Sequence, residues 1–365
     1  MVVAQRPGRV LGEGVAVSLP VRGSHEGRHH LDAPLRDLGR LPPQIGEAQV
    51  DVELQQVDSR WTVRHVKKPR SPVGRHLPLG NYHPLVAASR IRLGPARLPS
   101  REKPEHAVAL LVERGYTACE LDFESGFWMD YPWAEALGAA AQAHDIALSV
   151  HAPLFAFPGH PDERKAKQAL GALDRSAGLA SAAGAELVVI HPGFWLGRER
   201  PQTLDDVVRQ LEVLWERLER KERTVAFGVE VMGRVRELGS LDDVLELARR
   251  VPFVRPVLDF AHLHATSDGA FTDVEPFADA LAAADAASEP DAAFHIHFSD
   301  IAYANRNETK HLPYGAGTLR AEPLAEALAQ FTRSATVISE SPDERSTQAI
   351  GAVLGVGTSS ASRSS

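Results

Sequence analysis

Short apolar runs alternate with amphipathic stretches through most of this 365-residue chain, from about residue 90 to about residue 353. The runs fit buried strands, because they are short, rich in Val, Ile and Leu, and bounded by Gly, Pro and polar residues. Eight of them are present, at 90–95, 118–123, 146–153, 186–193, 225–233, 254–262, 293–300 and 335–342. This repetition restricts the fold more than any other feature of the chain.

Helical patterns follow the strands. They lie at Pro104–Arg114, Trp133–His144, Pro161–Ala183, Leu204–Arg220, Leu241–Arg250, Glu275–Ala286, Ala321–Phe331 and Asp343–Val353. Strands that alternate with helices form a parallel sheet, and eight such units fit an α/β fold of the closed (β/α)8 type, the TIM barrel. An open doubly wound sheet is the alternative, but no Gly-rich dinucleotide or phosphate loop supports it.

The two ends of the chain follow a different pattern. The first 89 residues are dense in Gly, Pro, Arg and His, and alternate like a strand only at 48–57. We predict that residues 1–89 are a largely disordered basic segment, with a small accessory domain as the alternative, and that residues 354–365 are a disordered tail. Residues 1–90 carry 13 Lys and Arg against 8 Asp and Glu, whereas 91–365 carry 27 against 40.

Composition argues against several classes of protein. Cys119 is the only cysteine, so no internal disulfide forms and a reducing, cytoplasmic setting is expected. No apolar run approaches the roughly 20 residues of a membrane helix. We therefore expect a cytoplasmic monomer that does not contact membranes. The acidic barrel is a poor match for a nucleic-acid backbone.

Residues that bind metal ions stand at the ends of most of the predicted strands. They are His151, His191, Glu230, Asp259, His262, His297 and Glu340. Successive members are separated by about one strand–helix unit, so closure of the sheet would bring them to one rim. Imidazole and carboxylate are ligands of Zn²⁺, Mn²⁺ and Fe²⁺, and a buried carboxylate without a partner costs several kcal/mol. The set therefore predicts a divalent metal centre.

Each residue alone has a simpler explanation. A single His after a strand is usually a surface or capping residue, Glu230 could be a buried ion-pair partner, and Asp259 with His262 could be a helix N-cap. The joint pattern is what favours a metal centre. Glu120 and Asp300 are candidates to orient ligand imidazoles, and His295 is a candidate for the core or for the same supporting role.

A long loop after the seventh strand adds a further candidate. His311 lies in this loop, 301–317, and precedes Gly315 and Gly317. Long loops with a His and Gly hinges are often functional. Arg306 and Lys310 would bring positive charge beside an anionic site.

The motifs around these residues resemble those of the endonuclease IV family of apurinic/apyrimidinic endonucleases, which belongs to the xylose-isomerase-like barrels. The motifs are His151 in HAP, His191 in HPG, Glu230, Asp259-x-x-His262, His297-x-x-Asp300, His311 before GAG and Glu340 in ESP. They cover residues 90–353 and are most similar to a divergent branch of that family.

The resemblance implies two or three zinc ions, with Mn²⁺ or Mg²⁺ as alternatives. The first would be held by His151, His191 and Glu230, the second by Glu230, Asp259, His297 and Glu340, and the third by His262 and His311. The main branch of the family has an Asp where this chain has Thr309, and Glu308 is adjacent but out of register. A third zinc would therefore take water or Glu308 instead.

The resemblance also implies the activity. A metal-bound hydroxide would hydrolyse DNA on the 5′ side of an abasic site, with Glu230 and Glu340 as catalytic residues. Phe155 and Phe157 would either wedge into the duplex or pack in the core.

A sugar isomerase or epimerase on the same barrel is the alternative. It would bind one metal ion with Glu230, Asp259, His297 and Glu340 and use carboxylates for proton transfer. The acidic barrel favours this alternative, whereas the number of imidazoles favours the nuclease. A metal-binding protein without catalysis is a third hypothesis.

Overall fold

The computed structural model describes residues 52–57, 60–65 and 91–356. The chain divides into two units, 1–82 and 83–365. In the first unit, β1 (Val52–Val57) and β2 (Arg60–His65) pair as antiparallel strands, and β1 falls within the strand predicted at 48–57. β2 lies where disorder was predicted, and the prediction for the other residues of 1–89 and for the tail beyond residue 356 lies outside the described residues.

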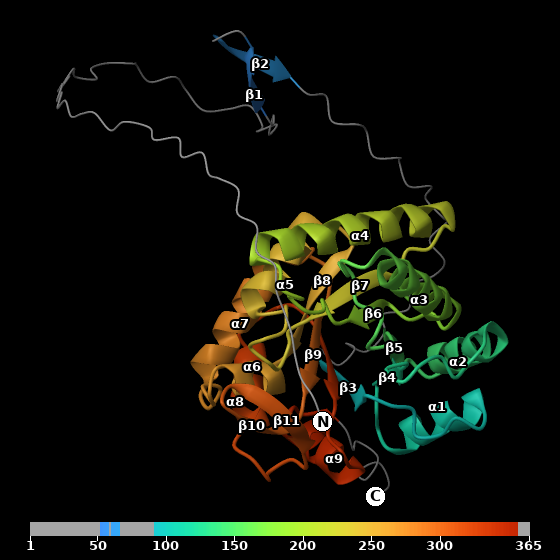
Figure 1. Ribbon diagram of the computed structural model, residues 1–365. Helices are drawn as coiled ribbons and strands as arrows, with labels where there is room; N and C mark the ends of the chain where they lie inside the picture. The colour runs from blue at the N-terminus through green and yellow to red at the C-terminus, as the bar shows by residue number, and fades with distance from the viewer. Residues whose placement is uncertain (1–51, 58–59, 66–90, 357–365) are drawn as a thin grey trace, which may run out of the picture. The chain divides into compact units, whose positions relative to one another are not determined.

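Eight parallel strands form the barrel of the second unit (Figure 1). They are β3 (Ile91–Pro95), β4 (Ala118–Asp122), β5 (Ala147–His151), β6 (Leu187–Ile190), β7 (Ala226–Glu230), β8 (Val254–Asp259), β9 (Phe294–Phe298) and β12 (Ala335–Ser339). The hydrogen-bonded order is β3-β12-β9-β8-β7-β6-β5-β4. Between β3 and β4, the Thr117 N–H donates to the Leu93 carbonyl at 3.0 Å. The predicted TIM barrel is confirmed.

Helices follow the strands and cover the outside of the barrel (Figure 1). They are α1 (Pro104–Glu113), α2 (Tyr131–Ala143), α3 (Glu163–Ala182), α4 (Arg200–Arg220), α5 (Leu241–Arg250), α7 (Val274–Ala286), α8 (Ala321–Leu328) and α9 (Glu344–Val353). Some of these helices begin with a side chain that caps the first turn. Ser240, for example, forms a reciprocal capping box with Asp243 at the start of α5.

Two predicted boundaries were wrong. The strand predicted at 254–262 ends at Asp259, because the Asp259 side chain accepts a hydrogen bond from the His262 N–H at 2.9 Å and caps a short helix, α6 (Phe260–Thr266). The N-cap explanation of this residue pair is thus confirmed, and His262 lies in the first turn of a helix. The predicted tail also begins too early, because Leu354 and Val356 are buried in the core.

The loop predicted after the seventh strand is instead a β-hairpin. β10 (Asp300–Ala304) pairs antiparallel with β11 (Asn307–Leu312), so His311 lies on a strand. Asn305 and Arg306 at the turn have φ values of 52° and 61°, the left-handed conformation that tight hairpin turns require. The alternation between apolar and polar residues that marks a buried strand is missing here, and most residues of the hairpin strands are only half-buried.

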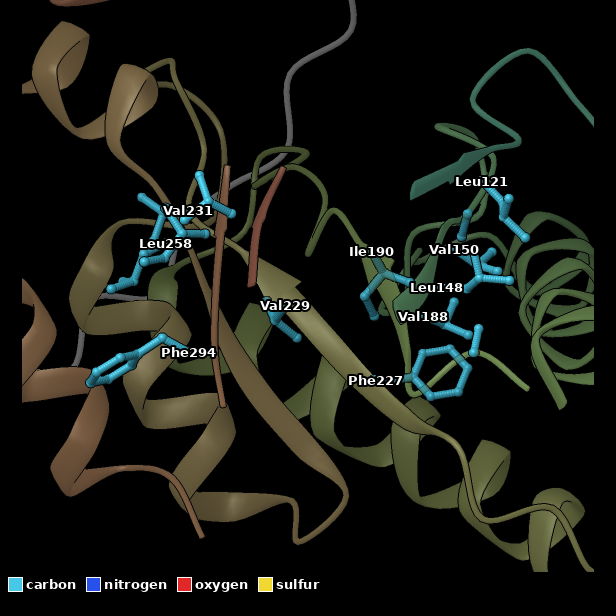
Figure 2. Packing of buried hydrophobic residues seen from close by; sticks show 14 of the residues in the cluster. Leu121, Leu148, Val150, Val188, Ile190, Phe227, Val229, Val231, Leu258 and Phe294 are labelled. Atoms are coloured by element: carbon cyan, nitrogen blue, oxygen red, sulfur yellow. The ribbon is translucent and has the colours of Figure 1, made fainter. Parts of the chain in front are cut away.

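The hydrophobic core lies mainly between the strands and the surrounding helices. Figure 2 shows part of it, including Val150, Ile190 and Phe227. Inside the barrel a smaller apolar cluster is formed by Leu187, Val189, Ala226 and Val257. The opposite side of the interior is polar.

The close approach of β3 and β4 gives a test of barrel closure. A Cβ on Gly94 would lie 1.6 Å from the Ala118 carbonyl oxygen, which is backbone and cannot move aside cheaply. We expect Gly94→Ala to lower the free energy of unfolding by about 2 kcal/mol or more, measured by urea denaturation. Gly171→Ala is the control, because Gly171 lies in α3 with nothing within 4 Å of an added Cβ and Ala favours helix. Equal stabilities for the two variants would contradict this closure.

Candidate metal centre

The predicted ligands gather at the carboxyl end of the barrel strands. His151, Glu230 and Asp259 are the last residues of β5, β7 and β8. His297 lies in β9, and His191 and Glu340 follow directly after β6 and β12. His262 from α6 and His311 from β11 join them, and all of these residues except Asp259 and His297 line a cavity of about 280 Å³. The structure therefore brings all eight sequence-predicted residues to one end of the barrel.

The first cluster contains His151, His191 and Glu230. Glu230 Oε2 lies 3.0 Å from His191 Nε2 and 3.4 Å from His151 Nε2. The other ring nitrogen of His151, Nδ1, is 2.9 Å from the Ala152 carbonyl oxygen. A carbonyl accepts only from an N–H, so Nδ1 carries the proton and the Nε2 lone pair faces the cluster.

The second cluster shares Glu230 with the first. Its members are Glu230, Asp259, His297 and Glu340, and one ligand atom from each lies within 4.8 Å of the others. His297 Nδ1 is 3.0 Å from Glu230 Oε1 and 3.4 Å from Glu340 Oε1. The two carboxylate oxygens of Glu230 thus face different clusters, which is the geometry of a bridging ligand.

The third cluster contains His262, His311 and Glu308. His262 Nδ1 lies 2.8 Å from the Val231 carbonyl oxygen, so its Nε2 is free to face Glu308 Oε2 at 2.6 Å. From the sequence alone, Glu308 is out of register with the other residues of this cluster. The pairing of β10 with β11 shows where its side chain lies.

A β-bulge brings Glu308 into this cluster. Ala302 pairs with Lys310 and Tyr303 with Glu308, so Thr309 is the extra residue in the register, and its hydroxyl donates to the Ala302 carbonyl at 2.9 Å. The extra residue reverses the alternation of side chains on β11, and Glu308 points to the same side as His311. The position of Glu308 depends also on Gly233, because a Cβ there would lie 2.6 Å from Glu308 Oε2. Glu308 therefore lies beside His262 and His311, although the sequence alone places it out of register.

The buried carboxyl groups have unequal pKa values. Burial, reinforced by Glu340 and Glu230, raises the pKa of Asp259 to about 7 against the opposing charge of His262. Burial also raises the pKa of Glu340. Although burial opposes its ionisation, imidazoles that carry a proton on both nitrogens while no metal ion is bound, chiefly His297, hold the pKa of Glu230 well below its usual range. Glu308 is similar, since His262 and Arg234 outweigh burial and lower its pKa to about 2.

Two buried oxygens fit a bound cation. The Nδ1–H of His262 is directed at the Val231 carbonyl, so a neutral His262 gives no hydrogen bond to Asp259 Oδ2 or Glu308 Oε2, although its ring nitrogens lie 3.1 and 2.6 Å from them. A buried oxygen left without a donor costs roughly 1–3 kcal/mol. A divalent ion would satisfy both. The clusters offer imidazole nitrogen and carboxylate oxygen, the donor set that suits Zn²⁺, Mn²⁺ and Fe²⁺. The residues present therefore fit the predicted metal centre.

The supporting residues differ in part from the prediction. Asp300, a candidate to orient an imidazole, instead accepts from the backbone N–H groups of Gly315, Gly317 and Leu319 and from Arg320. It fixes the segment between β11 and α8. Arg306 also differs from expectation, because its Nε donates to the Thr266 carbonyl at the end of α6.

Arg234 was missed by the sequence reasoning. It lines the cavity and lies 3.1 Å from Glu308 Oε1 and 3.3 Å from Glu237 Oε1. The only signal was its place, four residues after Glu230, in the loop between β7 and α5.

A TIM barrel with metal-ligating side chains at the carboxyl ends of its strands defines the class of this protein. The sequence pattern of the xylose isomerase-like TIM barrel family matches residues 108–356, and the chain belongs to this family. The family is enzymatic and metal-dependent, and it includes isomerases, epimerases and endonuclease IV. None of the helices in the described residues combines the length and apolar character needed to cross a membrane.

Individual relatives agree with this assignment. An uncharacterized protein of Methanocaldococcus jannaschii is 29% identical over 252 residues, which cover 68% of this chain and 91% of that protein. Among solved structures, a D-tagatose 3-epimerase-like protein and endonuclease IV from Thermus thermophilus both have a TM-score of 0.58, with 19% and 18% identity. Each likeness covers 72% of this chain and 96% or 97% of the other. At such identities these structures show the shared fold alone.

Replacement of Asp259 by Asn tests the charge balance of the metal-free centre. The folded pKa near 7 lies above the ordinary value of 3.8, so ionisation of Asp259 lowers stability progressively as pH rises from about 4 to about 7. Asn can still cap α6. We expect Asp259→Asn to raise the free energy of unfolding by roughly 1–3 kcal/mol at pH 8 and by less at pH 5, measured by urea denaturation with a chelator present. A loss of stability at pH 8 would contradict this assignment.

Proposed function

We propose that this protein is a metal-dependent phosphodiesterase that cleaves DNA on the 5′ side of abasic sites. The observation that carries the proposal is the arrangement of three ligand clusters around one cavity, with Glu230 facing two of them through different oxygens. A single-metal sugar enzyme needs the second cluster alone. Imidazoles from β5, β6, α6 and β11 have a clear use only if further ions bind.

The residues would divide the chemistry as follows. Bound divalent ions would supply Lewis acidity, polarising a phosphoryl group and making water more acidic. Glu230 would hold two ions at a fixed separation, and Glu340, whose pKa is raised by burial, would face the same space. Hydrogen bonds to backbone carbonyls fix the rings of His151 and His262, so both present Nε2 to the cavity. Arg234, beside Glu308, would bind a phosphate oxygen.

Apolar side chains at the mouth of the cavity support a nucleic-acid substrate. Leu154 and Phe194 line the cavity and are 46% and 41% exposed, and Phe155, which does not line it, follows Leu154 in the chain and is 51% exposed. Phe157 does not share this role, because its ring packs 5.4 Å from that of Phe194 and is half-buried. Of the two aromatic residues predicted to wedge or pack, Phe155 is thus the one free to stack on a base.

A sugar epimerase is the second candidate function. The acidic composition of residues 91–365 favours it, because a small neutral substrate is not repelled by that charge. The fold is as similar to a D-tagatose 3-epimerase-like protein as to endonuclease IV. The same cavity serves both hypotheses, so activity assays must separate them.

Glu230→Gln tests the phosphodiesterase proposal. We expect purified protein loaded with Zn²⁺ to nick a duplex with one abasic site, and we expect EDTA to stop the nicking. In the Glu230→Gln variant this activity should fall by more than about 100-fold. That loss would exceed what is usual for residues that only support a ligand. Glu246→Gln, on the surface of α5, is the control and should keep full activity. Epimerisation of a ketohexose without nicking would establish the alternative.

Phe155→Ala tests the role of the cavity mouth. Stacking on an aromatic side chain contributes roughly 1–3 kcal/mol for each base, so we expect the KM for abasic DNA to rise about 10-fold. Hydrolysis of bis(p-nitrophenyl) phosphate, which is too small to reach Phe155, should not change. The control is Val213→Ala on α4, which removes an exposed apolar side chain elsewhere. An unchanged KM in Phe155→Ala would remove this residue from the interface.

A further inference from the structure

Glu120 is a carboxylate in the interior of the barrel, below the metal centre. It lies on β4 and is 1% exposed. Its Oε2 accepts a hydrogen bond from Ser149 Oγ at 2.7 Å and lies 3.1 Å from His295 Nε2, while its Oε1 lies 3.1 Å from His297 Nε2. Ser149 lies on β5, and His295 and His297 lie on β9. The barrel therefore brings these three residues to Glu120 from two other strands.

No lysine or arginine neutralises this carboxylate within the described part of the chain. Its ion pairs there are with His295 and His297 alone. A buried carboxylate costs several kcal/mol unless charge or hydrogen bonds compensate for it. Simple packing would be served better by an apolar residue, as on the opposite side of the interior, where Leu187, Val189 and Val257 pack together.

The contact with His297 links Glu120 to the second cluster. The two nitrogens of this ring face opposite ways, Nδ1 toward Glu230 and Glu340 and Nε2 toward Glu120. A neutral imidazole has one N–H and one lone pair. His297 Nε2 is buried and makes no well-aligned hydrogen bond, and Glu120 Oε1 lies 3.1 Å from it. A metal ion at Nδ1 requires the lone pair of that nitrogen, so the proton of the metal-bound ring is on Nε2, beside this carboxylate.

We propose that Glu120 is a positioning residue that fixes the ring orientation and tautomer of His297 for metal binding in the second cluster. The proposal rests on the proposed metal centre, but not on DNA as the substrate. Carboxylates that hold a ligand imidazole in this way typically change metal affinity by about 10- to 100-fold. Ser149 and His295 hold Oε2, so the direction of Oε1 is set from the far side.

A fourth metal ion is the competing explanation. Ligand atoms of Glu120, His295 and His297 also lie within 4.8 Å of one another. However, Ser149 already donates to Glu120 Oε2 and His295 lies at hydrogen-bond distance from the same oxygen, so these contacts account for it without an ion.

Two variants of Glu120 test the proposal through metal affinity. Glu120→Gln keeps the shape and loses the charge, and Glu120→Ala loses both. Zn²⁺ affinity is measured by competition with a chromophoric chelator, and Co²⁺ absorption reports the ligand geometry. We expect one ion to bind about 10-fold more weakly in Glu120→Gln and about 100-fold more weakly in Glu120→Ala, with an altered Co²⁺ spectrum. Ser176→Ala, the same change at a buried serine on α3 outside the barrel interior, is the control and should change affinity less than about 3-fold.

Three results would overturn the proposal. Unchanged Zn²⁺ affinity in both Glu120 variants would show that the carboxylate is only structural. Complete loss of one bound ion in Glu120→Gln, with the affinity of the others unchanged, would assign the fourth metal site. In the Zn²⁺-loaded wild-type protein, ¹⁵N NMR of the histidine rings should show the Nε2–H tautomer for His297, and an Nδ1–H tautomer would contradict the proposal whether or not the variants fold. Weakened metal binding in a protein that does not nick DNA would leave this inference standing and reject the proposed substrate.

Discussion

The position of Glu230 at the end of β7 is the constraint on which the site depends. Its side chain is 1% exposed and has four imidazoles within 3.6 Å, from β5, β9, α6 and the residue after β6. A carboxylate so surrounded is held in its charged form, and each of its oxygens faces a different group of ligands. Burial instead raises the pKa values of the neighbouring Asp259 and Glu340, which favours their neutral forms. The excess of buried acid is balanced by the cations that such a site would bind.

The barrel supports this centre by dividing its interior. One side is filled by small and branched apolar residues, and Gly228 leaves the room that they need, since a Cβ there would lie 2.5 Å from Val257 Cγ2. The interior also holds Glu120, which lies against the back of His297, and Ser149 and His295, which contact Glu120. The ligand rings are thus fixed from beneath as well as from the rim, as a rigid site requires.

Most of the fold and most of the ligands could be predicted from the sequence, for a physical reason. Parallel strands buried on both faces are nearly continuous apolar runs, so a His or Glu at the end of such a run stands out, and the repeat places every strand end at one rim. His262, Glu308 and His311 could not be placed in this way. His262 depends on a helix that Asp259 starts, and Glu308 depends on a one-residue bulge at Thr309 in a hairpin without alternation. Glu120 and His295 are 175 residues apart in the sequence, and no local pattern reveals that Glu120 contacts His295 and His297.

The central claim is that one cavity holds more than one metal ion. Native mass spectrometry of protein purified in chelator and then given Zn²⁺ measures this directly. We predict that two or three zinc ions bind to each chain and that Glu230→Gln reduces the number by at least one. A wild-type chain that binds one ion or none under these conditions would contradict the account.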